Sequence, residues 1–242
     1  MIASLGMYPF AHLREAYDRL WQAVHQRLPG SPEALAHDID LHSAWHHPDL
    51  LVGQTCGWPL VTELAEVVVI GAFDVRVPFA AGGRYRSVII GNKPVAMGLQ
   101  NLAAVNGFGS LSGWVSLCHA LGGAPVRVVE TGAHAESVRA VAEGRAEVAS
   151  IDSMSFEFLA DSQPALVGRV HVIGHGPVVG SLPLVTAPAH ADRLADLQAA
   201  FSGAVADPAL ASALEVLRIR GFVPFDRSDY LPLLQIRPPS RH

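Results

Sequence analysis

The residues best suited to bind an anion lie in one short stretch, 106–113, which reads Asn-Gly-Phe-Gly-Ser-Leu-Ser-Gly. An apolar segment, 102–105, precedes it, and a helical pattern of apolar residues over 114–121 follows it. Ser110 and Ser112 stand where a helix N-cap belongs. A helix that begins here exposes unpaired N–H groups and the positive end of its dipole. We therefore predict an anion-binding turn, with simple helix capping as the alternative. The glycine spacing fits neither a P-loop nor a dinucleotide fingerprint.

Other polar loops occupy equivalent places along the chain. Predicted strands alternate with predicted helices, which favours parallel α/β sheets. Ligands of such sheets bind beyond the carboxyl ends of the strands. Small polar loops follow five of the predicted strands, and we expect them to converge: 6–8, 54–57, 107–113, 131–134 and 152–153.

Composition narrows the class of protein. The chain has 242 residues, half of them hydrophobic, enough for one large domain or two lobes of about 100 residues each. Only 16% are charged, the net charge is −5, and Lys93 is the sole lysine, so we expect no nucleic-acid partner. No apolar run approaches the length of a membrane span. The two cysteines, Cys56 and Cys118, permit at most one disulfide, and the sequence leaves their pairing open.

The polar segments also form an ordered set, which is more specific than any one of them. Its members are Gln54–Leu60, Tyr85–Val88, Asn106 with Ser110–Gly113, Thr131–His134 and Ile151–Asp152. Together they resemble the phosphate/phosphite/phosphonate-type solute-binding proteins of ABC importers, and the resemblance covers nearly the whole chain. It implies a type II periplasmic-binding-protein fold with two α/β lobes, each a mostly parallel sheet flanked by helices, joined by two hinge crossings. The implied lobes are 1–86 with 184–242, and 87–183.

The resemblance further implies a ligand site built from both lobes. In it Ser110, Ser112 and the amide of Gly113 hold the oxygens of a phosphonate or phosphate. The first lobe is expected to contribute Tyr8, Gln54, Thr55 and Tyr85. The second lobe is expected to contribute His134 and Asp152. No catalytic residue, cofactor or metal is implied.

From these residues we expect a non-enzymatic protein that captures a small phosphonate- or phosphate-like anion between two lobes, for an ABC permease. The N-terminal residues do not form an export signal, so we expect a periplasmic protein if a signal was removed and a cytoplasmic one otherwise. Two alternatives stay open. One is a cytosolic sensor on the same fold, and the other is a small hydrolase or pyrimidine-precursor synthase that uses the same cleft.

Asp152 raises a separate question of charge. A carboxylate that faces a phosphate dianion repels it, unless the two share a proton or the ligand carries an amine. We therefore hypothesise an aminoalkyl ligand or a singly protonated oxyanion. The simpler interpretation of Asp152 is a helix N-cap, and that of His134 is a surface histidine at a helix start.

Two further groups of residues have types and spacings that suggest a metal site and a catalytic pair, and we favour neither interpretation. Four histidines and three aspartates share one polar segment, in which the spacing of His42 and His46 is compatible with zinc binding. No His-Glu-x-x-His pattern accompanies them. We therefore prefer to interpret the segment as a solvated loop. The members of this group are His37, Asp38, Asp40, His42, His46, His47 and Asp49. Cys56 as a nucleophile with His134 as its base lacks any oxyanion-binding or orienting signature.

Overall fold

Two α/β units make up the chain in a computed structural model that describes residues 1–94 and 96–236. Unit 1 consists of 1–76, 80–84 and 180–232. Unit 2 consists of 77–79, 85–179 and the described residues from 233 onward. The division predicted from the sequence, near residues 86 and 184, remains a prediction.

Unit 1 is built on a five-stranded sheet of mixed direction in the order β1-β2-β11-β3-β12. The strands are β1 (Ile2–Ser4), β2 (Leu50–Gln54), β11 (Pro183–Thr186), β3 (Val68–Val75) and β12 (Ile219–Val223). Strands β1 and β2 are parallel, whereas β11 runs antiparallel to both β2 and β3, and β12 runs antiparallel to β3. The carboxyl ends of β1 and β2 therefore lie at the same edge of the sheet.

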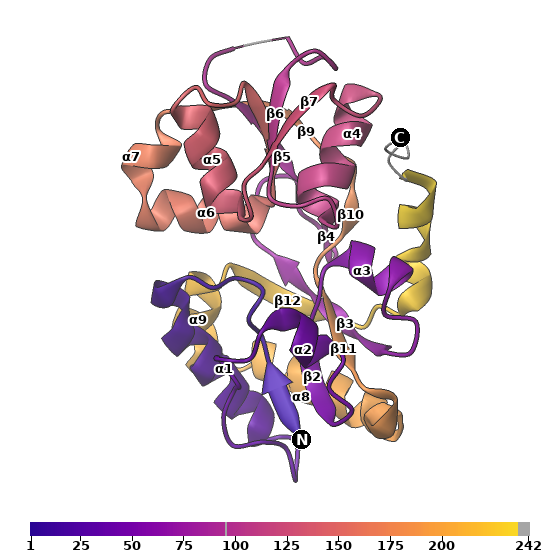
Figure 1. Cartoon of the computed structure of the whole chain (residues 1–242). Coiled ribbons are helices and arrows are strands. Elements are labelled where there is room, and N and C mark those ends of the chain that lie inside the picture. Colours follow the sequence, from indigo (N-terminus) through magenta and orange to yellow (C-terminus); the bar gives the residue numbers. More distant parts are fainter. Residues whose placement is uncertain (95, 237–242) are drawn as a thin grey trace. The chain divides into compact units, whose positions relative to one another are not determined.

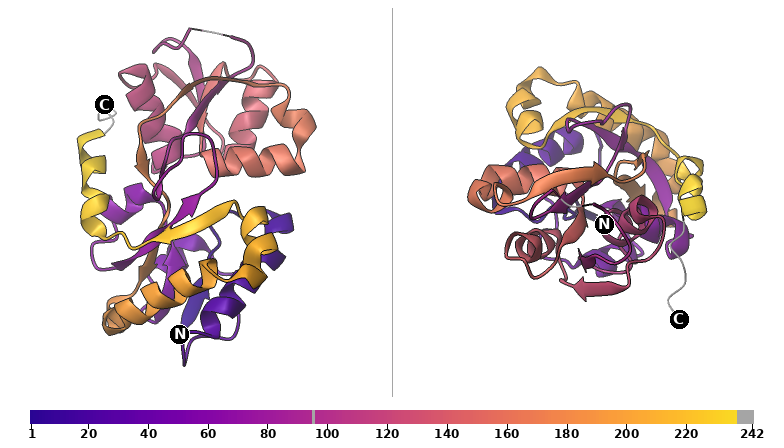
Figure 2. Two further views of the ribbon diagram at one scale, coloured as in Figure 1. Left: turned by 180° about the vertical axis from the view of Figure 1, so that it is seen from behind. Right: turned by 90° about the horizontal axis from the view of Figure 1, so that it is seen from above.

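The helices of unit 1 bury an apolar stripe against one another and the sheet. The helix α1 (Arg14–His25) turns Tyr17, Leu20, Trp21 and Val24 inward, as its 3.6-residue pattern predicts. It packs against α8 (Leu194–Val205) and α9 (Ala211–Val216), and α8 lies on β3 and β12 (Figures 1 and 2). Shorter elements complete the unit: η1 (Ala11–Leu13), α2 (Leu41–Trp45), α3 (Gly57–Thr62), η3 (Pro188–Arg193), η4 (Pro208–Leu210), η5 (Arg227–Asp229) and the beginning of η6 (Leu231–Ile236).

Unit 2 has its own five-stranded sheet, in the order β7-β6-β8-β5-β9. The strands are β7 (Arg127–Glu130), β6 (Leu102–Val105), β8 (Val148–Ile151), β5 (Val88–Gly91) and β9 (His171–His175). Strands β7, β6 and β8 are parallel, and β5 runs antiparallel to β8 and β9. Figure 1 shows α5 (His134–Ala142) and α4 (Ser116–Leu121) on either side of β6, with α6 (Ser153–Ser162) and α7 (Pro164–Val167) beside α5.

Two of the boundaries between the units fall within short strands that pair with each other. These are β4 (Arg84–Tyr85) and β10 (Val179–Gly180). Gly180 is required here, because a Cβ at this position would lie 2.7 Å from the ring of Tyr230. The phenol of Tyr230 in turn donates a 2.7 Å hydrogen bond to the carbonyl of Ser181.

The predicted α/β class is confirmed, but the structure corrects several details. The sheets are mixed because β11 and β12 in unit 1, and β5 in unit 2, run antiparallel to their neighbours. The sequence from Tyr85 to Gly91 has the pattern of one strand, but the structure divides it between β4 and β5. The polar segment 37–49, predicted as a loop, contains the helix α2, because the Asp40 side chain caps it by accepting the N–H groups of His42 and Ser43.

Candidate functional site

Polar residues follow three neighbouring parallel strands of unit 2. Asn106 follows β6, Thr131 follows β7 and Asp152 follows β8. Since the carboxyl ends of parallel strands meet at one edge of a sheet, the loops that carry these residues lie together. Six of the predicted site residues belong to this unit: Tyr85, Ser110, Ser112, Gly113, His134 and Asp152. We call these six residues the unit 2 cluster.

The turn after β6 begins a wider helix than the sequence predicts. Residues Leu111–Val115 form a π-helical turn, η2, and the α-helix α4 starts only at Ser116. Ser110 is the N-cap, and its hydroxyl accepts the N–H of Gly113 at 3.0 Å. The predicted capping by Ser110 is thus confirmed. The Gly113 amide already has an acceptor, so an anion bound here would take over that donor from the Ser110 oxygen. Single π-turns often occur at functional sites.

Ser112 connects this turn to two other elements. Its side chain is buried, and its hydroxyl lies 2.9 Å from Nε2 of His134, the first residue of α5. Its carbonyl accepts a 2.5 Å hydrogen bond from the hydroxyl of Ser150 in β8. Ser110 Oγ lies 3.5 Å from Ser112 Oγ. The two serines are therefore adjacent, and Ser112 is fixed from both sides.

The side chain of His134 is partly exposed, but its Nδ1 atom is shielded from solvent. Its Nδ1 is buried and has no hydrogen-bond partner among the residues that the structure describes. Burial lowers the pKa of His134 below its ordinary value of 6.5, and the negative charge of Asp152 opposes this shift. A neutral imidazole is consequently favoured near neutral pH. The Ser112 contact rules out the interpretation of His134 as a merely solvated surface residue.

Asp152 is the most enclosed charged residue of the cluster. It is 3% exposed, and one carboxylate oxygen accepts a 2.5 Å hydrogen bond from the phenol of Tyr85. The other oxygen accepts the N–H of Ser155 at 2.8 Å, which makes Asp152 the N-cap of α6. The capping interpretation is confirmed. Tyr85, which the sequence analysis placed in the first lobe, belongs to unit 2 and lies against Asp152.

Asn106 is a cluster neighbour that sequence reasoning did not include among the site residues. Its Oδ1 is buried without a hydrogen-bond partner among the described residues, and a Cβ at Gly113 would lie only 1.8 Å from it. The carboxamide therefore lies directly on the Cα of Gly113. Ser150 and Ser116 were missed as well, because serines inside apolar segments give no signal beyond their polarity. Ser116 Oγ accepts a 3.3 Å hydrogen bond from Ser87 Oγ.

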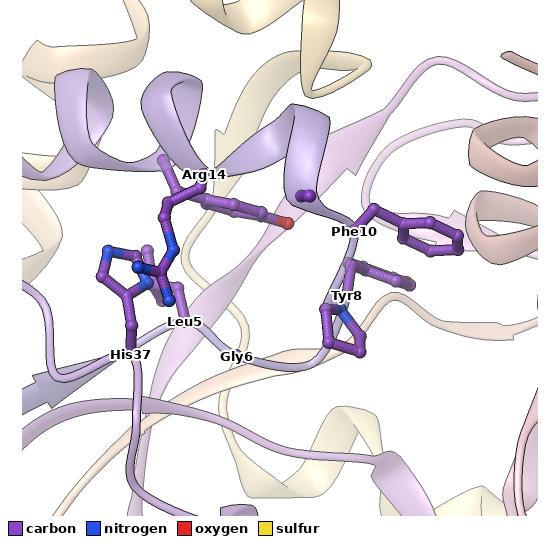
Figure 3. Close-up of a pocket in the computed structure, with 9 residues that line it drawn as sticks. Leu5, Gly6, Tyr8, Phe10, Arg14 and His37 are labelled. Atoms are coloured by element: carbon purple, nitrogen blue, oxygen red, sulfur yellow. The ribbon is translucent and has the colours of Figure 1, made fainter. Parts of the chain in front are cut away.

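The other three predicted site residues lie in unit 1. Tyr8 follows β1 and lines a pocket of this unit (Figure 3). Gln54 ends β2, is 4% exposed, and its buried Oε1 has no hydrogen-bond partner in the described chain. Thr55 is fully buried, and its N–H donates to the carbonyl of Pro183 at 3.0 Å. All three lie at or just after the carboxyl ends of the parallel strands β1 and β2, while Tyr85, predicted with them, does not.

In the polar segment 37–49, two of the histidines contact each other. The ring of His42 in α2 lies 4.4 Å from the ring of His46, which follows the helix, and His46 Nδ1 lies 2.9 Å from the carbonyl of His42. Within the described ranges, no group of three or more His, Cys, Asp or Glu side chains is placed to hold a metal ion. None of the described helices is long and apolar enough to cross a membrane.

The two units, each with a mixed sheet flanked by helices, match the fold of the two-lobed periplasmic binding proteins. A binding-protein component of an ABC phosphonate transporter from Pseudomonas aeruginosa shares 18% identity over 98% of this chain and 84% of its own, with a TM-score of 0.77. A Prochlorococcus marinus protein in complex with methylphosphonate, PhnD1, is 13% identical over 92% of each chain, with a TM-score of 0.69. A Xanthomonas citri protein bound to ATP is 14% identical over 92% of each chain, with a TM-score of 0.68. These similarities establish the fold.

A family model also matches part of the sequence. Residues 117–230 match the model of the periplasmic substrate-binding proteins of phosphonate ABC transporters. The resemblance predicted from the ordered polar segments is thereby confirmed for this part of the chain, which includes His134 and Asp152. No similar sequence is found among curated proteins.

Proposed function

We propose that the protein captures a small phosphonate- or phosphate-like anion at the unit 2 cluster and delivers it to an ABC permease. The observation that carries the proposal is the Ser110–Ser112–His134 arrangement, in which two hydroxyls and one imidazole lie within hydrogen-bond contact at the end of β6. The matched family is a component of transporters and not of enzymes. We propose that the protein acts in the periplasm, because the matched family consists of periplasmic proteins.

The chemistry of capture does not require a lysine. Charge-assisted hydrogen bonds contribute roughly 1.5–3 kcal/mol each. Three or four of them reach the roughly 8 kcal/mol of a micromolar complex. Ser110, Ser112 and the Gly113 amide supply such donors, and His134 adds a fourth polar contact. We propose that Tyr8, Gln54 and Thr55 supply the contacts from unit 1.

The buried carboxylate of the cluster, that of Asp152, sets a limit on the ligand. Asp152 already accepts two hydrogen bonds, so its oxygens need no ligand donor for satisfaction. Its negative charge nevertheless repels a doubly charged anion more than a singly charged one. We therefore propose that singly protonated oxyanions, or phosphonates that carry an amine, bind better than dianions.

Calorimetric titration of the full chain tests this function. The panel is phosphate, phosphite, methylphosphonate, 2-aminoethylphosphonate and sulfate, and we expect saturable 1:1 binding of at least one phosphorus oxyanion. Ser110→Ala and Ser112→Ala should each weaken that binding at least about tenfold, the loss expected for one charge-assisted hydrogen bond. Ser162→Ala is the matched control, since this exposed serine of α6 donates only to the carbonyl of Phe158. Absence of binding across the panel, or equal losses in all three variants, would refute the proposal.

A further inference from the structure

One contact in the unit 2 cluster has a direction that decides what Ser112 offers to a ligand. The hydroxyl oxygen of Ser112 lies 2.9 Å from Nε2 of His134, and the proton between them belongs to one or to the other. If Nε2 accepts, the single proton of the Ser112 hydroxyl is already used. If Nε2–H donates, that proton is left for a third group. The nitrogen of His134 that carries the proton therefore decides whether Ser112 can donate to an anion.

The surroundings of Nδ1 favour a proton on Nε2. Nδ1 of His134 is buried, and it has no hydrogen-bond partner among residues 1–94 and 96–236. The charge of Asp152 acts on the pKa of His134, but the two oxygens of this carboxylate accept the phenol of Tyr85 and the N–H of Ser155. A proton on Nδ1 would be a buried donor without an acceptor, which folded proteins rarely contain. The doubly protonated ring would carry the same unpaired N–H, and burial lowers the pKa of His134 against that form.

The other contacts of Ser112 hold it in place without taking its proton. Its carbonyl accepts the hydroxyl of Ser150 in β8 at 2.5 Å. Ser110 Oγ lies 3.5 Å away, well beyond the roughly 2.7–2.8 Å at which hydrogen bonds between hydroxyls are commonest. The Ser110 oxygen moreover already accepts the N–H of Gly113 at 3.0 Å. Ser112 is thus fixed by β8 and by the first residue of α5, and its own proton is left for a ligand.

We propose that His134 is a positioning residue for anion capture, in which its Nε2–H donates to Ser112 Oγ and thereby fixes the Ser112 hydroxyl as a donor to the ligand. This role rests on the proposed function, and it means that His134 acts on the anion through Ser112. It also narrows the chemistry of the ligand at this point of the site. The ligand atom that meets Ser112 is an acceptor, an unprotonated oxygen of the phosphonate or phosphate, and a P–OH group or an amine lies elsewhere.

Nitrogen NMR of the isotope-labelled full chain tests the tautomer without any ligand. In a neutral imidazole the protonated and the bare nitrogen have widely separated shifts, and couplings to the ring C–H groups distinguish Nδ1 from Nε2. We expect a protonated Nε2 and a bare Nδ1 for His134 above neutral pH. His134→Gln lacks the ring and so identifies this signal among those of the 12 histidines. A proton on Nδ1 would overturn the proposal, whatever the protein binds.

A double-mutant cycle tests the role in binding, with phosphate, phosphite and methylphosphonate as the probes. His134→Leu and Ser112→Ala should each weaken binding at least about tenfold. The double variant should bind no more weakly than Ser112→Ala alone, because the imidazole acts through the hydroxyl. His134→Gln should stay within about threefold of the original protein, since its side-chain amide can replace Nε2–H as a donor. His119→Leu, at an exposed position of α4, is the matched control and should leave affinity unchanged.

The outcomes separate this role from the proposed function. If the losses of His134→Leu and Ser112→Ala multiply in the double variant, His134 contacts the anion independently and the positioning role is wrong. The same conclusion follows if His134→Gln binds as weakly as His134→Leu. Either result leaves anion capture itself intact. Absence of binding for all three probes would refute the proposed function and this role together.

Discussion

The phenol of Tyr85 donates a 2.5 Å hydrogen bond to the carboxylate of Asp152, and the two side chains are 2% and 3% exposed. Asp152 also caps α6 through the N–H of Ser155. A buried carboxylate is costly unless its oxygens accept hydrogen bonds, and here each oxygen has a donor. The positive end of the α6 dipole adds a further favourable term. Tyr85 is the first residue of unit 2 after the boundary at Arg84, and its hydrogen bond connects it to the start of α6.

The Tyr85–Asp152 hydrogen bond predicts that two buried tyrosine hydroxyls, those of Tyr85 and Tyr230, contribute unequally to the free energy of unfolding. Tyr85→Phe removes a bond to a charged group and should lower the free energy of unfolding by roughly 1.5–3 kcal/mol. Tyr230→Phe removes a bond to the carbonyl of Ser181 and should cost only about 0.5–1.5 kcal/mol. Urea denaturation of both variants measures the difference. An equal or smaller cost for Tyr85→Phe would show that the phenol contributes little to holding Asp152.

The charge of Asp152 predicts a change in ligand preference. Asp152→Asn keeps an acceptor for Ser155 but removes the negative charge near the cluster. We expect affinity for methylphosphonate to rise relative to affinity for 2-aminoethylphosphonate, because the repulsion of the dianion and the attraction of the amine both disappear. Calorimetric titrations with the two ligands give the ratio. Asp161→Asn, at an exposed position of α6, should leave it unchanged, and an unchanged ratio in Asp152→Asn would contradict the charge argument.

The positions of the polar loops could be predicted because they depend on short-range patterns. The apolar segment 102–105 matches strand β6, because a short apolar run bounded by small polar residues is a local signal. Ser110 was identifiable as a cap for the same reason. The resemblance to a known family then selected His134 and Asp152 from many similar histidines and aspartates.

The rest depends on contacts that a local pattern does not contain. Tyr85 and Asp152 are 67 positions apart, and Ser112 and His134 are 22 apart, so no window of sequence relates them. The π-turn of η2 differs from an α-turn only in which carbonyl each N–H reaches, and both accept the same residues. The direction of β5 and β11 is likewise fixed by pairing with distant strands.

The contact between Asn106 and Gly113 makes a further prediction. An added Cβ at Gly113 would lie 1.8 Å from Asn106 Oδ1, so Gly113→Ala must displace the carboxamide or open the η2 turn. We expect a loss of roughly 1–3 kcal/mol in the free energy of unfolding, together with weaker anion binding. Gly109→Ala is the matched control in the same loop, because a Cβ there meets open space. Thermal and calorimetric measurements that show equal effects in both variants would contradict this view of the turn.

The buried imidazole of His134 predicts how stability depends on pH. Its pKa in the folded protein lies below the ordinary value of 6.5, chiefly because of burial, so the unfolded chain binds the proton more readily. Above about pH 7.5 both states are neutral at this residue, and it contributes no pH dependence. As the pH falls through 6.5 the unfolded state gains the proton first, and stability decreases by up to about 1.4 kcal/mol per pH unit until the folded pKa is reached. His175, whose pKa burial and Arg86 also lower, contributes a slope of the same sign.

His134→Gln should therefore reduce the loss of stability on acidification without abolishing it. Chemical denaturation at pH 5, 6, 7 and 8 gives the difference in unfolding free energy between the variant and the original protein, and we expect this difference to shift in favour of the variant as the pH falls. Any constant offset from the altered contact with Ser112 drops out, because only the change with pH is compared. His119→Gln, at an exposed position of α4, serves as the control. A difference that stays constant from pH 5 to pH 8 would show that burial does not hold His134 neutral, and would remove the basis for treating it as an uncharged contact in the proposed anion site.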